Sequence, residues 1–173
     1  MMNEEWKPVN IRGVRFPGYY VSNMGRILSK KGKKEKLLTV QEKYAGSGRG
    51  NAAIVNLSKP KDLIVDEYYN RTSYSVPTKQ QVHQLVMWAF RPIDDYPPEQ
   101  LKDDWNDAPE SFKQWVRDTV VIDHINDNAY DNRLENLRYV TPKQNNHHRK
   151  HHVNRTVQTH LHSSEILSET TPG

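Results

Sequence analysis

The spacing of apolar residues predicts strands in the first third of the chain and a helix near its middle. Short apolar stretches flank the turn-forming tetrapeptide 22–25, which ends in glycine, so we expect a β-hairpin there. A further strand is expected over Ala52–Leu57. In residues 82–90 the apolar residues have the spacing of a helix, at i, i+3, i+4 and i+7. They are Val82, Leu85, Val86 and Ala89.

A second helix is predicted over Pro109–Asp118. Proline suits the first turn of a helix, and the glutamate that follows it favours the positive end of the helix dipole. Phe112, Trp115 and Val116 lie at i, i+3 and i+4, so we expect them to form its packing face.

The segment after this helix predicts strand, polar loop, strand and helix. Residues 120–122 are β-branched, the loop 123–136 is rich in asparagine, and Leu137–Thr141 reads as the second strand. Thr141 then suits the N-cap of a helix that begins at Pro142. Beyond residue 150 the chain is rich in His, Ser and Thr, and we expect a disordered tail over 151–173.

Composition narrows the chemistry that is open to this pattern. The 173 residues include no cysteine, which excludes disulfides, thiolate zinc sites and cysteine nucleophiles. A metal would be held by Asp, Glu, Asn or His, a set suited to Mg²⁺ or Mn²⁺, although zinc on His and carboxylate stays open. No apolar run approaches the roughly 20 residues of a membrane span, and the N-terminus lacks a secretory signal, so we expect an intracellular, cytoplasmic protein.

Charge is distributed unevenly along the chain, whose net charge is +4. Residues 1–90 hold 15 Lys/Arg against 7 Asp/Glu, a net +8, whereas residues 91–120 hold 4 against 8, a net −4. A phosphate-facing surface and a solvated basic loop are equally consistent with the N-terminal excess. The candidates for contact with nucleic acid are Arg26, Lys30, Lys31, Lys33, Lys34, Lys36 and Arg49.

The reactive groups gather around the predicted hairpin. Asp123 and His124 end its first strand, and their side chains point to opposite faces, so one can hold a metal while the other addresses a water. A residue of the following helix, within 145–148, can face Asp123. Hydrolysis of a phosphodiester needs such a cation and such a base. His83 we interpret as a packed or partly exposed helix residue rather than a ligand.

The run VIDHINDNAYDNRLENLRYVTPKQNN resembles the HNH (ββα-metal) motif of homing endonucleases from phage group I introns. VHQLVMWAF is similar to the helix that precedes that motif, and WKPVNIRGVRFPGYYVSNMGRILS is similar to a NUMOD-type N-terminal module. The resemblance implies that Asp123 and Asn145 are metal ligands, that His124 is the general base, and that Asn136 is a structural residue that pins the loop. Asn146, His147 or His148 stands as an alternative to Asn145.

Together these features predict an α+β protein: a β-rich DNA-binding module over 1–80, an HNH core over 81–150 with an acidic insertion at 91–119, and the tail. The expected function is a metal-dependent DNA endonuclease, phage-encoded by resemblance, acting on double-stranded DNA as a monomer or a homodimer and using Mg²⁺ or Mn²⁺. The alternatives are a nonspecific or RNA-directed nuclease on the same centre, and an inert DNA-binding accessory protein. The chain shows no helix-turn-helix pattern after the motif, which leaves recognition of a long target site open.

Overall fold

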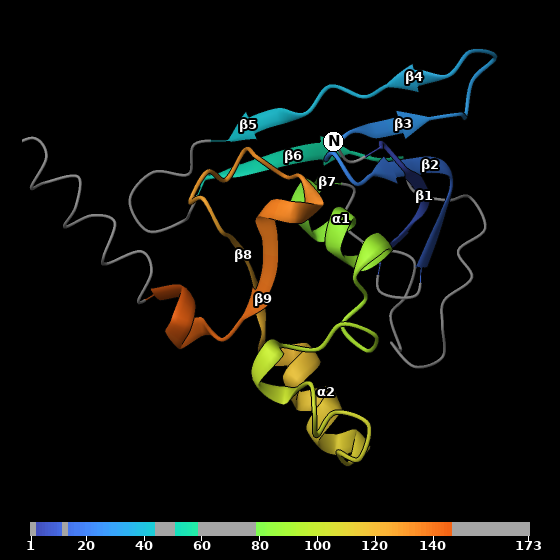
Figure 1. Ribbon diagram of the computed structural model, residues 1–173. Coiled ribbons are helices and arrows are strands. Elements are labelled where there is room, and N and C mark those ends of the chain that lie inside the picture. Colours follow the sequence, from blue (N-terminus) through green and yellow to red (C-terminus); the bar gives the residue numbers. More distant parts are fainter. Residues whose placement is uncertain (1–2, 12–13, 44–50, 59–78, 147–173) are drawn as a thin grey trace, which may run out of the picture.

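A computed structural model describes residues 3–11, 14–43, 51–58 and 79–146 (Figure 1). Its strands and helices are, in chain order, β1 Trp6–Ile11, β2 Val14–Ser22, β3 Ile27–Ser29, β4 Lys36–Leu37, β5 Gln41–Lys43, β6 Ala52–Asn56, β7 Lys79–Gln81, α1 Val82–Phe90, η3 Glu99–Leu101, α2 Glu110–Thr119, β8 Val121–His124, η4 Leu134–Asn136 and β9 Leu137–Val140. Residues 142–146 are also helical. Arg49, His147, His148 and the tail 151–173 lie outside the described residues.

Strands β1 to β4 form one antiparallel sheet in sequence order, and β5 to β7 form a second antiparallel sheet. The predicted hairpin at 22–25 is confirmed. Gly25 closes the turn at φ 78°, where a side chain is disfavoured, and the Ser22 hydroxyl accepts hydrogen bonds from the backbone N–H groups of Met24 and Arg26. The sequence of this turn therefore fixes how β2 and β3 pair.

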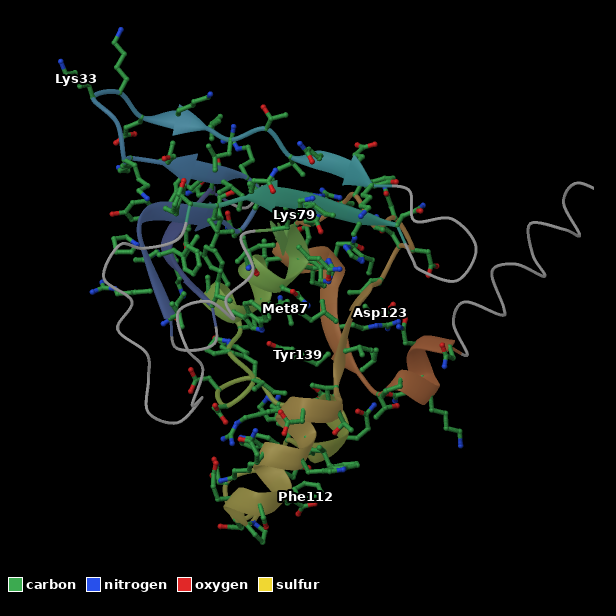
Figure 2. The ribbon with its side chains drawn as sticks, turned by 180° about the vertical axis from the view of Figure 1, so that it is seen from behind. Lys33, Lys79, Met87, Phe112, Asp123 and Tyr139 are labelled. Atoms are coloured by element: carbon green, nitrogen blue, oxygen red, sulfur yellow. The ribbon has the colours of Figure 1, made fainter. Side chains whose placement is uncertain are left out.

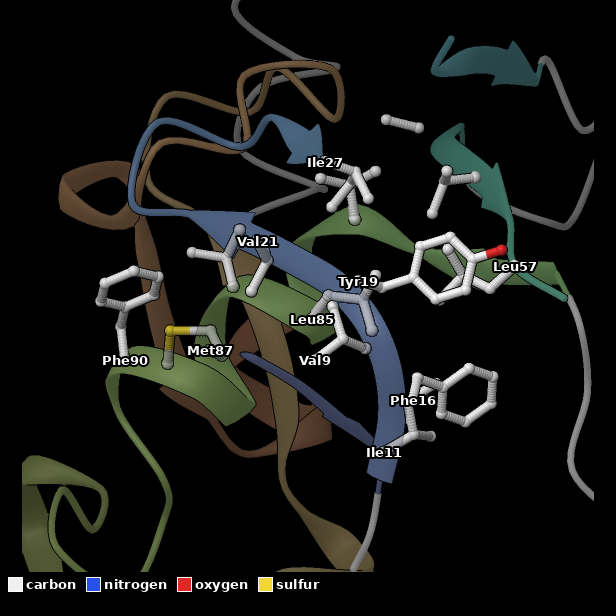
Figure 3. Packing of buried hydrophobic residues seen from close by; sticks show 14 of the residues in the cluster. Val9, Ile11, Phe16, Tyr19, Val21, Ile27, Leu57, Leu85, Met87 and Phe90 are labelled. Atoms are coloured by element: carbon white, nitrogen blue, oxygen red, sulfur yellow. The ribbon is translucent and has the colours of Figure 1, made fainter. Parts of the chain in front are cut away.

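Helix α1 has the predicted bounds and packs against the N-terminal sheets. Its buried residues Leu85 and Met87 meet Val9 and Val21 of the first sheet in one hydrophobic cluster (Figure 3). The same cluster contains Leu137 from β9. A single core thus joins the first sheets, α1 and the second half of the chain, while the proposed division into modules at residue 80 stays a prediction.

The predicted strand–loop–strand–helix is present. β8 and β9 pair antiparallel, with Asp123 opposite Arg138 and His124 opposite Leu137. After β9, Thr141 and Gln144 bond reciprocally: the Gln144 backbone N–H donates to the Thr141 hydroxyl, and the Gln144 side-chain oxygen accepts from the Thr141 backbone N–H. This capping box begins the helix at the residue that the sequence indicates.

The predicted packing face of α2 is wrong in two of its three residues. Val116 is buried, but Trp115 is 61% exposed and Phe112 is 38% exposed, and their rings stack on each other at the surface. Figure 1 shows α2 at the end of the molecule opposite the N-terminal sheets, far from the main hydrophobic cluster. The apolar spacing is that of a helix, but little protein covers its stripe.

The α+β fold class is confirmed, with β-rich sheets at the N-terminus and a β-hairpin followed by a helix in the second half. Among the described helices, none combines the length and the apolar character that a membrane span requires.

Candidate active site

Asp123 lies near the end of β8 and is held by the strand beside it. The residue is only 7% exposed, and a single carboxylate oxygen, Oδ2, accepts two hydrogen bonds from Arg138, at 2.9 Å from Nε and 2.8 Å from Nη2. No described residue makes a hydrogen bond to Oδ1. The guanidinium therefore fixes the carboxylate and leaves one oxygen for a further ligand.

His124 is oriented by Asn132, which is buried in the loop between β8 and β9. The Asn132 amide nitrogen donates to the carbonyl of Tyr130 at 3.1 Å, which identifies its Oδ1 as the acceptor facing His124. His124 Nε2 lies 3.1 Å from that oxygen, so Nε2 carries the proton. The other ring nitrogen, Nδ1, has no hydrogen bond to any described residue, and in the neutral ring it carries the lone pair that a general base requires.

The side chain of Asn136 makes three hydrogen bonds within the same loop. Its Oδ1 accepts from the Asn126 backbone N–H at 3.0 Å, while Nδ2 donates to the Asn126 side chain at 2.9 Å and to the Asp131 carbonyl at 2.8 Å. The residue is buried. These contacts support the structural role that the resemblance implies, because they tie both sides of the loop beside His124.

A cleft of about 630 Å³ brings the three predicted site residues together, with Asp123, His124 and Asn145 all in its lining. Asn145 comes from the helix 142–146, which lies beside β8 (Figure 1), and is half-buried. Asn146 is exposed and does not line the cleft. The geometry thus favours Asn145 over Asn146, while His147 and His148 lie outside the described residues.

Oxygen atoms dominate what this cleft offers to a cation. The free Oδ1 of Asp123 and the amide oxygen of Asn145 are hard donors of the kind that Mg²⁺ and Mn²⁺ prefer. Within the described ranges, no three His, Cys, Asp or Glu side chains are grouped as a metal site. The residues therefore fit a cation held by few protein ligands, whose other positions are open to water and phosphate.

The acidic insertion forms a wall of this cleft. Asp94, Arg117 and Asp118 line it together with Asp123. Arg117 Nε donates to Asp94 at 2.9 Å, and its Nη1 donates to Glu110 at 2.6 Å. The bond to Asp94 holds α2 against the segment that follows α1, while the bond to Glu110 lies within α2.

His83 is a partly buried residue of α1, as the sequence indicates, and it also faces this site. Its ring meets that of His124 edge to face, with centroids 5.2 Å apart and planes at 80°. His83 lines the cleft, but its Nδ1 is buried and makes no hydrogen bond within the part of the chain that the structure describes. Burial, reinforced by the charge that His124 can carry, lowers the pKa of His83 to about 4, so this ring is neutral near pH 7.

The predicted basic residues that the structure describes, which exclude Arg49, do not line the cleft. Arg26 donates to Glu4 through Nε at 2.7 Å, and Lys30 pairs with Glu35 at 2.7 Å, so both charges are partly compensated. Lys31 lies over the ring of Tyr19. Figure 2 shows Lys33 at the tip of the β3–β4 hairpin, well separated from Asp123. The structure does not gather these residues with the three cleft residues.

The turn of the first sheet touches the loop that holds His124. The Leu134 backbone N–H donates to the carbonyl of Asn23 at 2.8 Å. A Cβ added at Gly25 would lie 3.0 Å from the backbone oxygen of Asn132, so glycine permits this close approach. Asn132 is thus supported from the N-terminal part of the chain as well as from its own loop.

Residues 116–147 match the family model described as HNH endonuclease, and the match encloses Asp123, His124, Asn136 and Asn145. The chain carries an HNH endonuclease motif. Residues 4–51 match the model of the NUMOD4 motif. The predicted resemblance to HNH endonucleases with a NUMOD-type module is therefore confirmed. It is the motif-bearing hairpin, rather than the N-terminal sheets, that holds the candidate chemistry.

Among curated proteins, an uncharacterized HNH endonuclease of Acanthamoeba polyphaga mimivirus is 30% identical over 146 residues, which is 84% of this chain. The chain spans about a quarter of that relative, 26% of its length. Among solved structures, the chain is similar to the HNH homing endonuclease I-HmuI, in a structure that describes DNA binding and cleavage by that enzyme. The TM-score is 0.47 at 22% sequence identity, and the match covers 95% of this chain and 68% of the other.

Arg138 and Asn132 were missed from the sequence, and the ring contact of His83 with His124 was not predicted. Arg138 follows from strand register, because an antiparallel hairpin with His124 opposite Leu137 places Arg138 opposite Asp123. Asn132 and His83 have no such signal. The loop offers several asparagines of equal character, and His83 is separated from His124 by 41 positions along the chain.

Proposed function

We propose that this protein is a metal-dependent DNA endonuclease that hydrolyses phosphodiester bonds in the cleft beside β8. The observation that carries the proposal is the convergence of Asp123, His124 and Asn145 on one cleft within the segment that matches the HNH model. The name of the similar curated protein, an HNH endonuclease, supports the same class of reaction.

The reaction follows from the state of His124. With its proton on Nε2 and directed to Asn132, the ring takes a proton from water at Nδ1. The oxygen of that water adds to phosphorus, the phosphorus–oxygen bond to one nucleoside breaks, and the departing oxygen takes a proton from solvent. Asn132 stabilises the protonated ring that results, because its side-chain oxygen accepts the hydrogen bond from the Nε2–H group.

Asp123 and Asn145 are the proposed holders of the divalent cation, Mg²⁺ or Mn²⁺. When bound, such a cation neutralises charge that develops on the phosphoryl group and on the departing oxygen. Arg138 contributes indirectly: by occupying Oδ2 of Asp123, it keeps the remaining oxygen in one orientation.

Double-stranded DNA is the proposed substrate, bound by a surface that includes the β3–β4 hairpin. Lys33, Lys34 and Lys36 are exposed there, and no described residue forms an ion pair with them. We propose that these lysines, with Arg26, Lys30, Lys31 and Arg49, contact phosphates and position the duplex. Site-specific nicking or cleavage, as in homing endonucleases, is the finer form of the proposal.

The test uses supercoiled plasmid incubated with the purified full chain, with and without Mg²⁺ or Mn²⁺, beside His124→Ala. We expect conversion to nicked or linear plasmid only with a divalent cation, and a loss of at least about 100-fold in rate in the variant. The matched control is Gln100→Ala, on the exposed surface of η3 and outside the cleft. No cutting by the wild type in either metal, or equal cutting by His124→Ala, contradicts the proposal.

A second measurement separates site-specific from nonspecific cutting. Mapping the ends of the products on two unrelated plasmids gives one recurring sequence if the enzyme recognises a site. Scattered ends on both plasmids would instead support a nonspecific nuclease with the same centre. Cutting of RNA in preference to DNA would contradict the proposed substrate.

A further inference from the structure

His83 stands out because it is a partly buried residue with a buried ring nitrogen, Nδ1, that the proposed reaction does not use. It is the second residue of α1. The core holds the apolar face of this helix, which includes the buried residues Val82, Leu85 and Val86. That anchorage places the ring of His83 at a fixed position beside β8, with which α1 is also in contact.

The contact between the two rings restricts His124 on a side that Asn132 does not. Asn132 holds the Nε2 edge of His124 through one hydrogen bond, about which the ring can still tilt. The ring of His83, at 80° and 5.2 Å, lies in the favourable range for an edge-to-face pair. A planar neighbour of this kind limits the tilt and so fixes the direction of Nδ1.

The chemistry of His83 argues against a role in holding the fold alone. Its Nδ1 is shielded from solvent and has no hydrogen-bond partner among the described residues, and an unpaired polar atom in that position destabilises a protein. A neutral imidazole, which the lowered pKa ensures, adds no positive charge that would oppose protonation of His124. The planar, uncharged ring of His83 can therefore contact the ring of His124 without opposing its protonation.

We propose that His83 is a positioning residue for His124, holding its imidazole through the edge-to-face ring contact so that Nδ1 stays directed into the cleft. This inference rests on the proposed function of His124 as the base. It assigns α1, which lies outside the matched HNH segment, a part in the geometry of the site.

Two substitutions of similar volume separate a planar ring from mere bulk. His83→Phe keeps a planar aromatic ring without nitrogen, whereas His83→Leu fills the space without one. We expect His83→Leu to lower the single-turnover rate of plasmid cutting about tenfold or more, because a small misplacement of a catalytic group is costly. We expect His83→Phe to stay within about threefold of the wild type, and the Kd for DNA of both variants to stay within about twofold.

A second readout does not depend on activity. Nitrogen-detected NMR of the histidine rings, with the His124 signal assigned by its loss in His124→Ala, reports which ring nitrogen carries the proton. We expect the Nε2–H form in the wild type and in His83→Phe, and a mixture of both forms in His83→Leu. Thermal unfolding of each variant is followed in parallel, so that a folding defect is recognised as such.

The outcomes are distinct. An unchanged His124 spectrum in His83→Leu, or a His83→Phe variant that shows the same mixture as His83→Leu, overturns the positioning role. A rate for His83→Leu equal to that of the wild type overturns it as well. If the wild type does not cut DNA at all, the proposed function fails, and the ring spectra still decide whether His83 holds His124.

Discussion

Two asparagines of the candidate site are expected to respond in opposite ways to the same substitution. Asn136→Ala removes three hydrogen bonds of a buried side chain, each with a neutral partner. At about 1 kcal/mol per bond, the loss is about 3 kcal/mol. Asn126 is exposed, so water compensates part of its loss, and we expect a decrease of about 2–3 kcal/mol in the free energy of unfolding.

The matched substitution is Asn145→Ala. Its side chain makes no hydrogen bond to any described residue and is half-buried, so we expect a change within about 0.5 kcal/mol. Urea unfolding, followed by circular dichroism at one temperature, measures both variants against the wild type. For a chain of this size, Asn136→Ala should also melt roughly 5–10 °C lower.

Activity should reverse the order. Assayed well below its melting temperature, Asn136→Ala should keep measurable cutting of plasmid, whereas Asn145→Ala should need a higher concentration of Mg²⁺ to reach half-maximal rate. The reasoning is refuted if Asn136→Ala unfolds at the same urea concentration as the wild type. It is equally refuted if Asn145→Ala loses stability without any change in its Mg²⁺ requirement.

Four further outcomes are expected. Asn132→Leu should slow cutting at least about tenfold and produce a mixture of the two protonated forms of the His124 ring, measured by nitrogen-detected NMR. A cutting rate equal to that of the wild type would remove Asn132 from the mechanism. Gly25→Ala should cost about 1 kcal/mol or more in urea unfolding and also slow cutting, because the turn has positive φ and meets the loop backbone; an unchanged unfolding midpoint would contradict this. Lys33→Ala with Lys34→Ala should reduce the dependence of log K on log salt by about two, measured by DNA binding across salt concentrations; an unchanged slope would exclude both from phosphate contact. The pKa of His83 in the folded chain, about 4, lies below the ordinary 6.5, so the unfolded chain binds the proton more readily. The contribution of His83 to the free energy of unfolding should therefore be complete above pH 6.5 and should decrease as the pH falls towards 4. His83→Phe should lose that part of the pH dependence, and parallel plots of unfolding free energy against pH for variant and wild type would contradict the shift.

Much of the scaffold follows from sequence because its signals are local. The helical period at 82–90, the glycine that closes the 22–25 turn and the capping residues at 141–144 each act within a few positions. The pair Asp123-His124 is likewise located by the strand that precedes it. Its partner Asn145 follows from the resemblance and from the helix that Thr141 begins.

What the sequence could not supply depends on contacts between distant segments. An apolar stripe indicates a helix but not how much protein covers it, which is why Trp115 was expected to pack and is exposed. The loop 126–136 holds four asparagines of the same type, and only its folded path distinguishes Asn132, which meets His124, from Asn136, which pins the backbone. The ring contact of His83 requires the docking of α1.

The docking of the 22–25 turn on the loop around Asn132 has a consequence for where the protein would cut. The proposed phosphate contacts and the base belong to parts of the chain that touch directly and share one hydrophobic core. Packing, rather than the length of a flexible linker, then sets how many base pairs separate the phosphate contacts from the cleaved bond. Such an enzyme cuts at a constant distance along the duplex from the phosphates that it contacts.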